Sequence, residues 1–133
     1  MRIKAAFLGG TGLLLLACAP PPEVSGRALF VEHCAACHGT DARGGGPLAA
    51  GLDRTVPDLT MIAKRHNAAF PMAQVMSQID GYRRARAGDV VMPEFGAALQ
   101  AGDLVLFDTG DGIVSPTPER LVDLALYLKS IQR

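Results

Sequence analysis

Residues 34–38 are Cys-Ala-Ala-Cys-His, which places two thiols three positions apart and an imidazole directly after the second thiol. This spacing is typical of c-type haem attachment, in which Cys34 and Cys37 bind the haem vinyl groups and His38 binds the iron. A zinc site would need further Cys or His ligands, but the one remaining cysteine, Cys18, lies in the leader. A thioredoxin-like redox pair usually follows a strand in a βαβ pattern, which we do not find here. The motif therefore predicts one covalently attached haem c, with an incidental or disulfide-bonded cysteine pair as the alternative.

The first 17 residues have the pattern of an export signal. Arg2 and Lys4 form a basic start, and the largely apolar run over residues 5–16 is too short to span a bilayer comfortably. The run ends in Leu-Leu-Ala-Cys at residues 15–18, which resembles a bacterial lipobox, so we expect cleavage before Cys18 and lipidation of its thiol. Diacylglyceryl modification would supply the second acyl chain that stable anchoring needs. The alternative is ordinary cleavage after Ala19, which would release a soluble periplasmic protein.

These assignments use all three cysteines and predict a protein that faces the periplasm from a membrane anchor, without structural disulfides. Removal of residues 1–17 leaves 116 residues, enough for one domain. It also leaves 11 basic against 13 acidic residues, and a net charge of −2 argues against a nucleic-acid partner. We expect residues 18–24, with three consecutive prolines, to form a stiff, extended tether that holds a domain over residues 25–133 off the membrane.

Helices are expected at both ends of this domain. Ser25 is a candidate N-cap for a helix from residue 26 to about residue 34. Thr117 is a candidate cap and Pro118 the candidate first residue of the last helix. Apolar residues recur along that helix at helical spacing, at Leu121, Leu124, Ala125, Leu128 and Ile131.

With the haem motif, these features make the chain similar to a class I c-type cytochrome, a small all-α electron-transfer protein, from about residue 25 to residue 132. In that family the first helix crosses the last, with a glycine and an aromatic residue at the crossing. Gly26 and Phe30 match these positions, and Tyr127 with Leu128 matches the last helix. The resemblance implies an all-α cytochrome c fold in which these two helices pack together.

Residues 90–96, Val-Val-Met-Pro-Glu-Phe-Gly, form an apolar segment stiffened by a proline. A thioether is a neutral ligand that suits haem iron and raises its reduction potential. The segment resembles the axial-ligand loop of bacterial class I cytochromes, and Met92 lies 54 residues after His38. We therefore predict that Met92 is the distal ligand. Met72 and Met76 lie at helical spacing, which favours a packing role.

A proline carbonyl is expected to support the proximal histidine. In cytochromes of this family it accepts a hydrogen bond from Nδ1 of that histidine and fixes the ring. Pro57 with Leu59 resembles this support, and Pro47, which is nearer to His38 in the sequence, is the alternative.

Shorter elements are expected between the two motifs. The pattern predicts a glycine-rich loop over residues 39–52, a short helix over residues 59–66, and a helix over residues 72–79 that opens at Pro71 and ends at Gly81. His33 is interpreted as a surface residue, and His66 is a weak alternative for the distal ligand.

Residues 102–114 depart from the simplest family pattern, in which the last helix follows almost directly. Apolar runs on either side of Asp-Thr-Gly-Asp-Gly at residues 108–112 predict a small β-hairpin. The spacing of a calcium-binding loop is absent. We expect this insertion either to cover the haem or to form a partner surface.

Charge is unevenly distributed along the chain. Five basic residues and one acid fall between residues 64 and 86, whereas five acids and no base fall between residues 89 and 111. The basic group is interpreted either as solvated loops or as a rim that meets haem propionates or a docking partner.

These features together predict an electron carrier, not an enzyme, although it could be a subunit of a larger oxidoreductase. A His/Met-ligated haem would exchange electrons with protein partners and bind no small-molecule substrate at the iron. The alternative is a haem-based ligand sensor or peroxidase-like enzyme with an open or labile sixth position.

Overall fold

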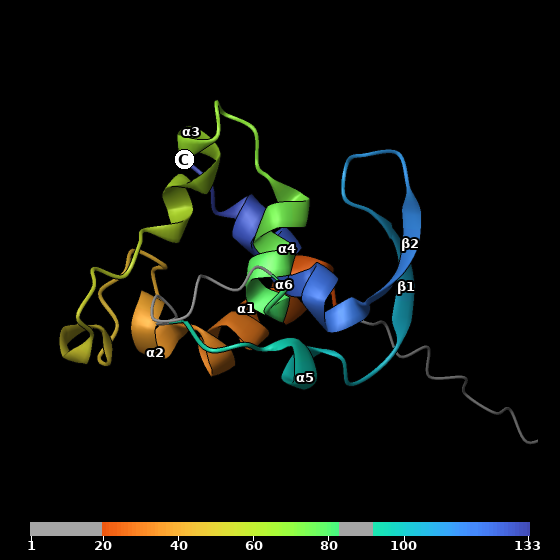
Figure 1. The fold of residues 1–133 in the computed structure, drawn as a ribbon. Coiled ribbons are helices and arrows are strands. Elements are labelled where there is room, and N and C mark those ends of the chain that lie inside the picture. Colours follow the sequence, from red (N-terminus) through yellow and green to blue (C-terminus); the bar gives the residue numbers. More distant parts are fainter. Residues whose placement is uncertain (1–19, 83–91) are drawn as a thin grey trace, which may run out of the picture.

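The computed structural model describes residues 20–82 and 92–133 and is mostly helical, with one small β-hairpin before the last helix (Figure 1). Helices α1, α4 and α6 form the centre, α2 and the loop after it lie on one side, and the hairpin lies on the other. The predicted all-α fold with a hairpin insertion is confirmed. The elements are α1 (Pro22–His33), α2 (Ala35–His38), η1 (Ala49–Gly51), η2 (Leu59–Met61), α3 (Ile62–Arg65), α4 (Met72–Asp80), α5 (Gly96–Leu99), β1 (Leu104–Asp108), β2 (Val114–Pro118) and α6 (Glu119–Ser130).

Helices α1 and α6 cross in close contact, as the spacing of their residues predicted. Gly26 lies at the crossing, where an added Cβ would collide with the backbone of Asp123 and with the Cβ of Tyr127. The rings of Phe30 and Tyr127 pack with their centroids 5.5 Å apart, and Phe30 is completely buried. A glycine is therefore needed here because it lets the two helix backbones approach.

The predicted starts of both helices were wrong. Helix α1 begins at Pro22, so residues 22–24, which we expected in the extended tether, are helical. A proline suits the first turn of a helix because its missing N–H would be unpaired there. Ser25 is not the N-cap: its hydroxyl contacts the carbonyls of Pro21 and Pro22 and the carboxylate of Asp123.

Helix α6 begins at Glu119, with Pro118 as its cap and no side-chain capping bond. Thr117 does not cap the helix because it lies in β2, opposite Val105. The predicted apolar face of α6 is buried except at its last residue, Ile131, which is half-buried.

The core lies between α1, α4 and α6. Phe30, Leu99 and Leu124 are its most completely buried large side chains. Met72 and Met76 are 7 % and 6 % exposed and belong to the same cluster, so the prediction that they are packing residues is confirmed.

The middle of the chain follows the expected pattern with small shifts. The helix predicted over residues 59–66 is divided into η2 and α3, and its last residue is Arg65. Pro71 precedes α4 as its cap, and Gly81 ends α4 in a left-handed conformation with φ of 98°. Glycine adopts this conformation at helix ends without a steric cost.

The hairpin pairs β1 with β2 in antiparallel register, with Leu106 opposite Pro116. Its turn is closed by Asp108, whose Oδ1 accepts hydrogen bonds from the N–H groups of Gly110, Asp111 and Gly112. The hairpin was predicted, but β2 extends four residues further than the expected end at residue 114. Within residues 20–82 and 92–133, no helix is long and apolar enough to cross a membrane.

Candidate functional site

The cysteine–histidine motif folds as one helical turn. The N–H groups of Cys37 and His38 donate to the carbonyl of Cys34, over 3.2 and 2.9 Å. Side chains three and four positions apart share a helix face, so this turn brings the two thiols and the imidazole to one side. Cys34 and His38 are each 8 % exposed, and Cys37 is half-buried.

The glycine-rich loop packs against this turn. The N–H groups of Gly44, Gly46 and Leu48 donate to the carbonyls of His38, Cys37 and Ala36. Gly46 lies so close to the α2 backbone that an added Cβ would collide with it. The loop therefore holds α2 in place through main-chain hydrogen bonds, and its glycines permit that approach.

Pro57 is the hydrogen-bond partner of His38. The Nδ1 atom of His38 lies 3.3 Å from the Pro57 carbonyl oxygen. A carbonyl can only accept, so Nδ1 carries the proton and donates it, and the second ring nitrogen, Nε2, keeps its lone pair. The contact involves the carbonyl of Pro57 and not that of Pro47. This arrangement is the one a histidine needs in order to bind a metal through Nε2.

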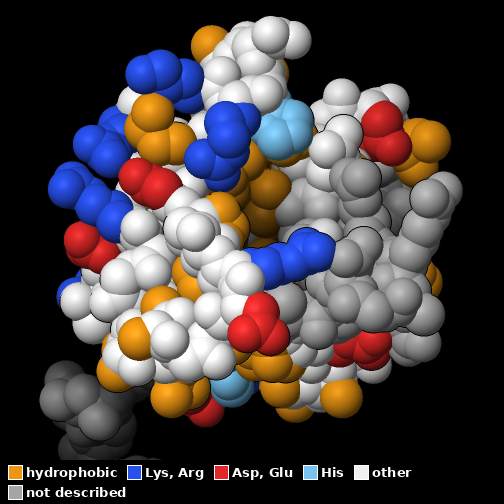
Figure 2. All heavy atoms as spheres, turned by 60° about the vertical axis from the view of Figure 1, so that its left-hand side comes forward, with side chains coloured by type: hydrophobic (Ala, Val, Ile, Leu, Met, Phe, Trp, Pro, Cys, Tyr) orange, Lys and Arg blue, Asp and Glu red, His pale blue; other side chains and the backbone are white. Residues whose placement is uncertain are grey.

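A cavity of about 730 Å³ opens next to the motif and is lined by Cys34, Cys37, His38 and Met92. Much of the remaining lining is apolar and comes from the loop before η2, from η2 and α3, from α4 and from α6, at Val56, Leu59, Ile62, Val75, Ile79 and Leu128. Figure 2 shows the hollow, with hydrophobic side chains inside it and a histidine and basic side chains near its opening. Its size falls within the range of cofactor sites in proteins, about 300–1,000 Å³.

Met92 lines this cavity and is the only methionine among residues 20–82 and 92–133 to do so. The segment after it packs against the end of α4, since the N–H of Phe95 donates to the carbonyl of Ile79 over 3.0 Å. Gly96 follows, so close to Asp80 that an added Cβ would collide with it. Val90 and Val91, the first residues of the predicted ligand loop, lie outside the described residues.

The family model for cytochrome c matches residues 24–132. The chain belongs to the cytochrome c family. It carries one haem c, bound covalently, and is a haem-based electron-transfer protein. No curated protein and no solved structure matches this cytochrome.

The cavity of this cytochrome fits a haem by its chemistry as well as its size. Two thiols, a buried imidazole and a thioether line the same apolar hollow, and groups of these kinds can hold haem c and its iron in cytochromes. Burial lowers the pKa of His38, and the hydrogen bond to Pro57 opposes this only in part. The imidazole is therefore neutral at pH 7, which is the form that binds a metal.

Burial, together with the neighbouring Cys37, raises the pKa of the Cys34 thiol to about 11. In the chain before haem attachment this thiol is therefore protonated at neutral pH.

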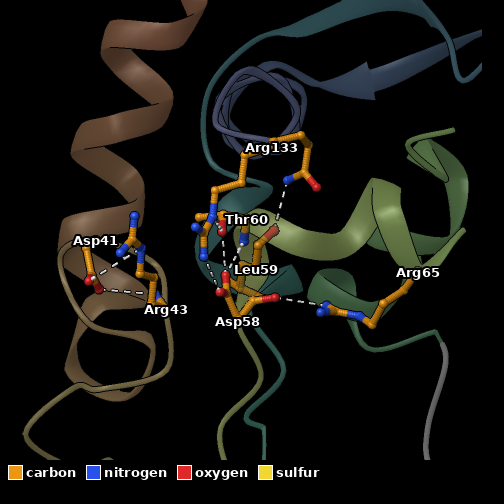
Figure 3. Close-up of polar contacts among 8 residues, drawn as sticks. Asp41, Arg43, Asp58, Leu59, Thr60, Arg65 and Arg133 are labelled. Atoms are coloured by element: carbon orange, nitrogen blue, oxygen red, sulfur yellow. Dashed lines mark hydrogen bonds and ion pairs between the residues drawn. The ribbon is translucent and has the colours of Figure 1, made fainter. Parts of the chain in front are cut away.

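Four residues that the sequence analysis did not single out hold the Pro57 segment in place (Figure 3). Asp58 Oδ1 accepts from the N–H of Thr60 over 2.8 Å and from its hydroxyl over 2.6 Å. Arg133 reaches both residues, since its Nη2 lies 3.0 Å from Asp58 Oδ2 and its Nε donates to Thr60 Oγ1 over 2.8 Å. The amide of Gln132 donates to the Leu59 carbonyl over 2.8 Å. The end of the chain thus clamps the segment that supports His38.

These bonds lower the pKa of Asp58, first through the Thr60 hydroxyl and also through Arg133. The carboxylate is therefore charged throughout the neutral range. Of these residues, only Asp58 and Thr60 had a local sequence signal, since an Asp two residues before a Thr is a common turn and cap pattern.

The other two histidines also line the cavity. His33, expected on the surface, is mostly buried: its ring lies 5.9 Å from that of Phe95, and its Nε2 is buried without a hydrogen-bond partner. His66 is exposed and its Nδ1 lies 2.9 Å from the Ile62 carbonyl oxygen.

The predicted basic rim is only partly within the described residues. Arg65 donates to the Asp58 carbonyl over 2.9 Å, whereas Arg83, Arg84 and Arg86 lie outside them. Among residues 20–82 and 92–133, Arg54 is the one lysine or arginine that lines the cavity, and it was not part of that prediction.

The hairpin insertion does not cover the cavity, because no residue of β1 or β2 lines it. Within residues 20–82 and 92–133, no three His, Cys, Asp or Glu side chains gather closely enough to hold a metal ion by themselves.

Proposed function

We propose that this cytochrome carries single electrons between protein redox partners by outer-sphere transfer. Cys34 and Cys37 would hold the haem covalently, His38 would be its proximal ligand and Met92 its distal ligand. The observation that carries the proposal is that all four side chains line one cavity. Bound there, the haem supplies an iron that exchanges one electron between its ferrous and ferric states.

The protein's own contribution is orientation and exclusion of water. The Pro57 carbonyl holds the proton of His38 on Nδ1 and so fixes both the tautomer and the plane of the ring. The clamp of Asp58, Thr60 and Arg133 holds that carbonyl in turn. The apolar lining of the cavity limits the movement of solvent that accompanies a change of charge.

The proposed distal role of Met92 is supported by its position in the cavity and by the packing of its segment on α4. Met72 and Met76 are buried in the core and do not line the cavity. With both axial positions filled, no small-molecule substrate would need to bind the metal.

We further propose that Cys18 is lipidated and that the domain faces the periplasm from this anchor. The support is the leader sequence alone: a basic start, an apolar run and a cysteine directly after it. A Cys18→Ser variant should appear in the soluble fraction, and its retention on membranes would argue against the anchor.

The first test is the visible spectrum of the purified protein, oxidised and reduced, followed by addition of carbon monoxide to the reduced form. We expect a c-type spectrum that carbon monoxide leaves unchanged, because a strongly held sixth ligand blocks the iron. Rapid binding of carbon monoxide would show an open sixth position and would favour a sensor or a peroxidase-like enzyme.

A further inference from the structure

One face of the hairpin is apolar and turned outward. Leu104 and Leu106 are 63 % and 75 % exposed, and the register places Pro116 beside Leu106 on the same face. Val114, opposite Asp108, continues the face and is 59 % exposed. We call these four apolar residues the hairpin face. The alternate residues of β1, Val105 and Phe107, pack against the core, so the hairpin is held against the domain with this face exposed.

The hairpin and α2, which carries Cys37 and His38 of the cavity lining, lie on opposite sides of the helical centre (Figure 1). Helix α6 follows β2 directly at one end, and its Leu128 lines the cavity at the other. The first turns of α1 lie against the first half of α6, where Ser25 contacts Asp123, and the chain then reaches the cavity at Cys34. The chain therefore enters the domain at the hairpin end.

The entry point limits where a lipid anchor can be. Helix α1 begins at Pro22, only four residues after Cys18. Four residues of extended chain span at most about 14 Å. A lipid on Cys18 would therefore keep the start of α1, and with it the hairpin end, at the membrane surface.

We infer that the hairpin face lies on the bilayer that holds the Cys18 lipid. This inference rests on the proposed anchor at Cys18. An exposed apolar patch on a rigid element is typical of a membrane or protein contact, and a single acylated residue leaves a domain free to tumble unless a second contact orients it. The result would be a fixed orientation in which the haem cavity opens away from the membrane, toward periplasmic partners.

The charges near the hairpin indicate which lipids it suits. Asp103 precedes β1, Asp108 is its last residue and Asp111 lies in the turn, and neither strand contains a lysine or an arginine. The face therefore lacks the cations that would attract anionic lipid, and it should prefer a zwitterionic bilayer.

The test measures how fast a charged maleimide modifies a single introduced thiol on the haem-loaded, lipidated protein. Leu106→Cys reports the hairpin face, and Thr40→Cys, at an exposed residue in the loop after α2 that does not line the cavity, is the control. Each variant is compared on phosphatidylcholine–phosphatidylethanolamine vesicles and, with Cys18→Ser added, in solution. We expect vesicles to slow the Leu106→Cys reaction roughly tenfold, because charged groups are excluded from the apolar part of a bilayer. The Thr40→Cys rate should not change.

Equal Leu106→Cys rates on vesicles and in solution would overturn the inference while leaving the anchor intact, because the protein would still sediment with the vesicles. Slow modification at Thr40→Cys instead would also overturn it, by showing the reverse orientation. A Leu106→Cys rate that falls with protein concentration in solution would overturn it in favour of a second copy of the chain. If the lipidated preparation does not sediment with vesicles, the anchor itself fails.

Discussion

The clamp on the Pro57 segment can be tested by replacing Thr60 with valine. Thr60 is 5 % exposed, and its hydroxyl both donates to Asp58 and accepts from Arg133. Valine has nearly the same shape, so the substitution removes these two hydrogen bonds and keeps the packing. The backbone bonds of Thr60, from its N–H to Asp58 and from the N–H of Arg133 to its carbonyl, remain.

A hydrogen bond contributes about 0.5–1.5 kcal/mol to stability, and more when one partner is charged. The side chains of Asp58 and Arg133 are 27 % and 51 % exposed, so water can replace part of what each loses. We therefore expect Thr60→Val to lower the free energy of unfolding by about 1–2 kcal/mol. For a domain of this size that corresponds to a fall in Tm of about 4–10 °C.

The assay is reversible unfolding of the haem-loaded protein in guanidinium chloride, followed by circular dichroism. Thr40→Val is the control, because Thr40 is exposed in the loop after α2. The visible spectrum of Thr60→Val should match that of the wild type, since the backbone contacts persist. Wild-type stability in Thr60→Val, or an equal loss in Thr40→Val, would refute the clamp.

Three further outcomes are expected. Asp58→Asn should destabilise the protein at neutral pH but not in acid. The pKa of Asp58 is lowered in the folded state, so the contribution of its carboxylate to stability is complete above about pH 4 and is lost as the pH falls through the folded-state pKa. Unfolding of the variant and the wild type, measured from pH 7 to pH 2, checks this. Gly26→Ala should destabilise by more than 2 kcal/mol in the same assay because its Cβ collides with α6, whereas Gly45→Ala, with open space around it, should be close to neutral. Met92→Ala should lower the reduction potential and let the reduced protein bind carbon monoxide, whereas Met72→Ala should reduce stability alone. An unchanged potential and spectrum in Met92→Ala would exclude Met92 as a ligand.

The haem motif and the crossing of the terminal helices could be predicted because their signals are local. The spacing of Cys34, Cys37 and His38 places them on one helical turn wherever that turn forms. Gly26 and Phe30 lie one turn apart, so a single helix presents both to its neighbour. Even the choice of Pro57 over Pro47 as the partner of His38, made on resemblance, agrees with the contact in the structure.

The features that were missed depend on contacts between distant parts of the chain. Serine is a common N-cap residue, but the hydroxyl of Ser25 contacts Asp123, which lies 98 residues away in the sequence. Arg133 and Gln132 are separated from the Pro57 segment by more than 70 residues, so no local pattern relates them. His33 is buried by Phe95 from another segment, which helical spacing alone does not reveal.

The length of chain between the two sides of the clamp has a consequence for maturation. A chain is made from its N-terminus, so the cysteine–histidine motif is complete 95 residues before Arg133 is added. Until Arg133 is added, the segment that orients His38 lacks the hydrogen bonds of its outer support. We expect the covalent attachment of haem to take place in this interval, before the clamp has closed. Closure of the clamp would then hold the Pro57 carbonyl, and with it the imidazole of His38, in position.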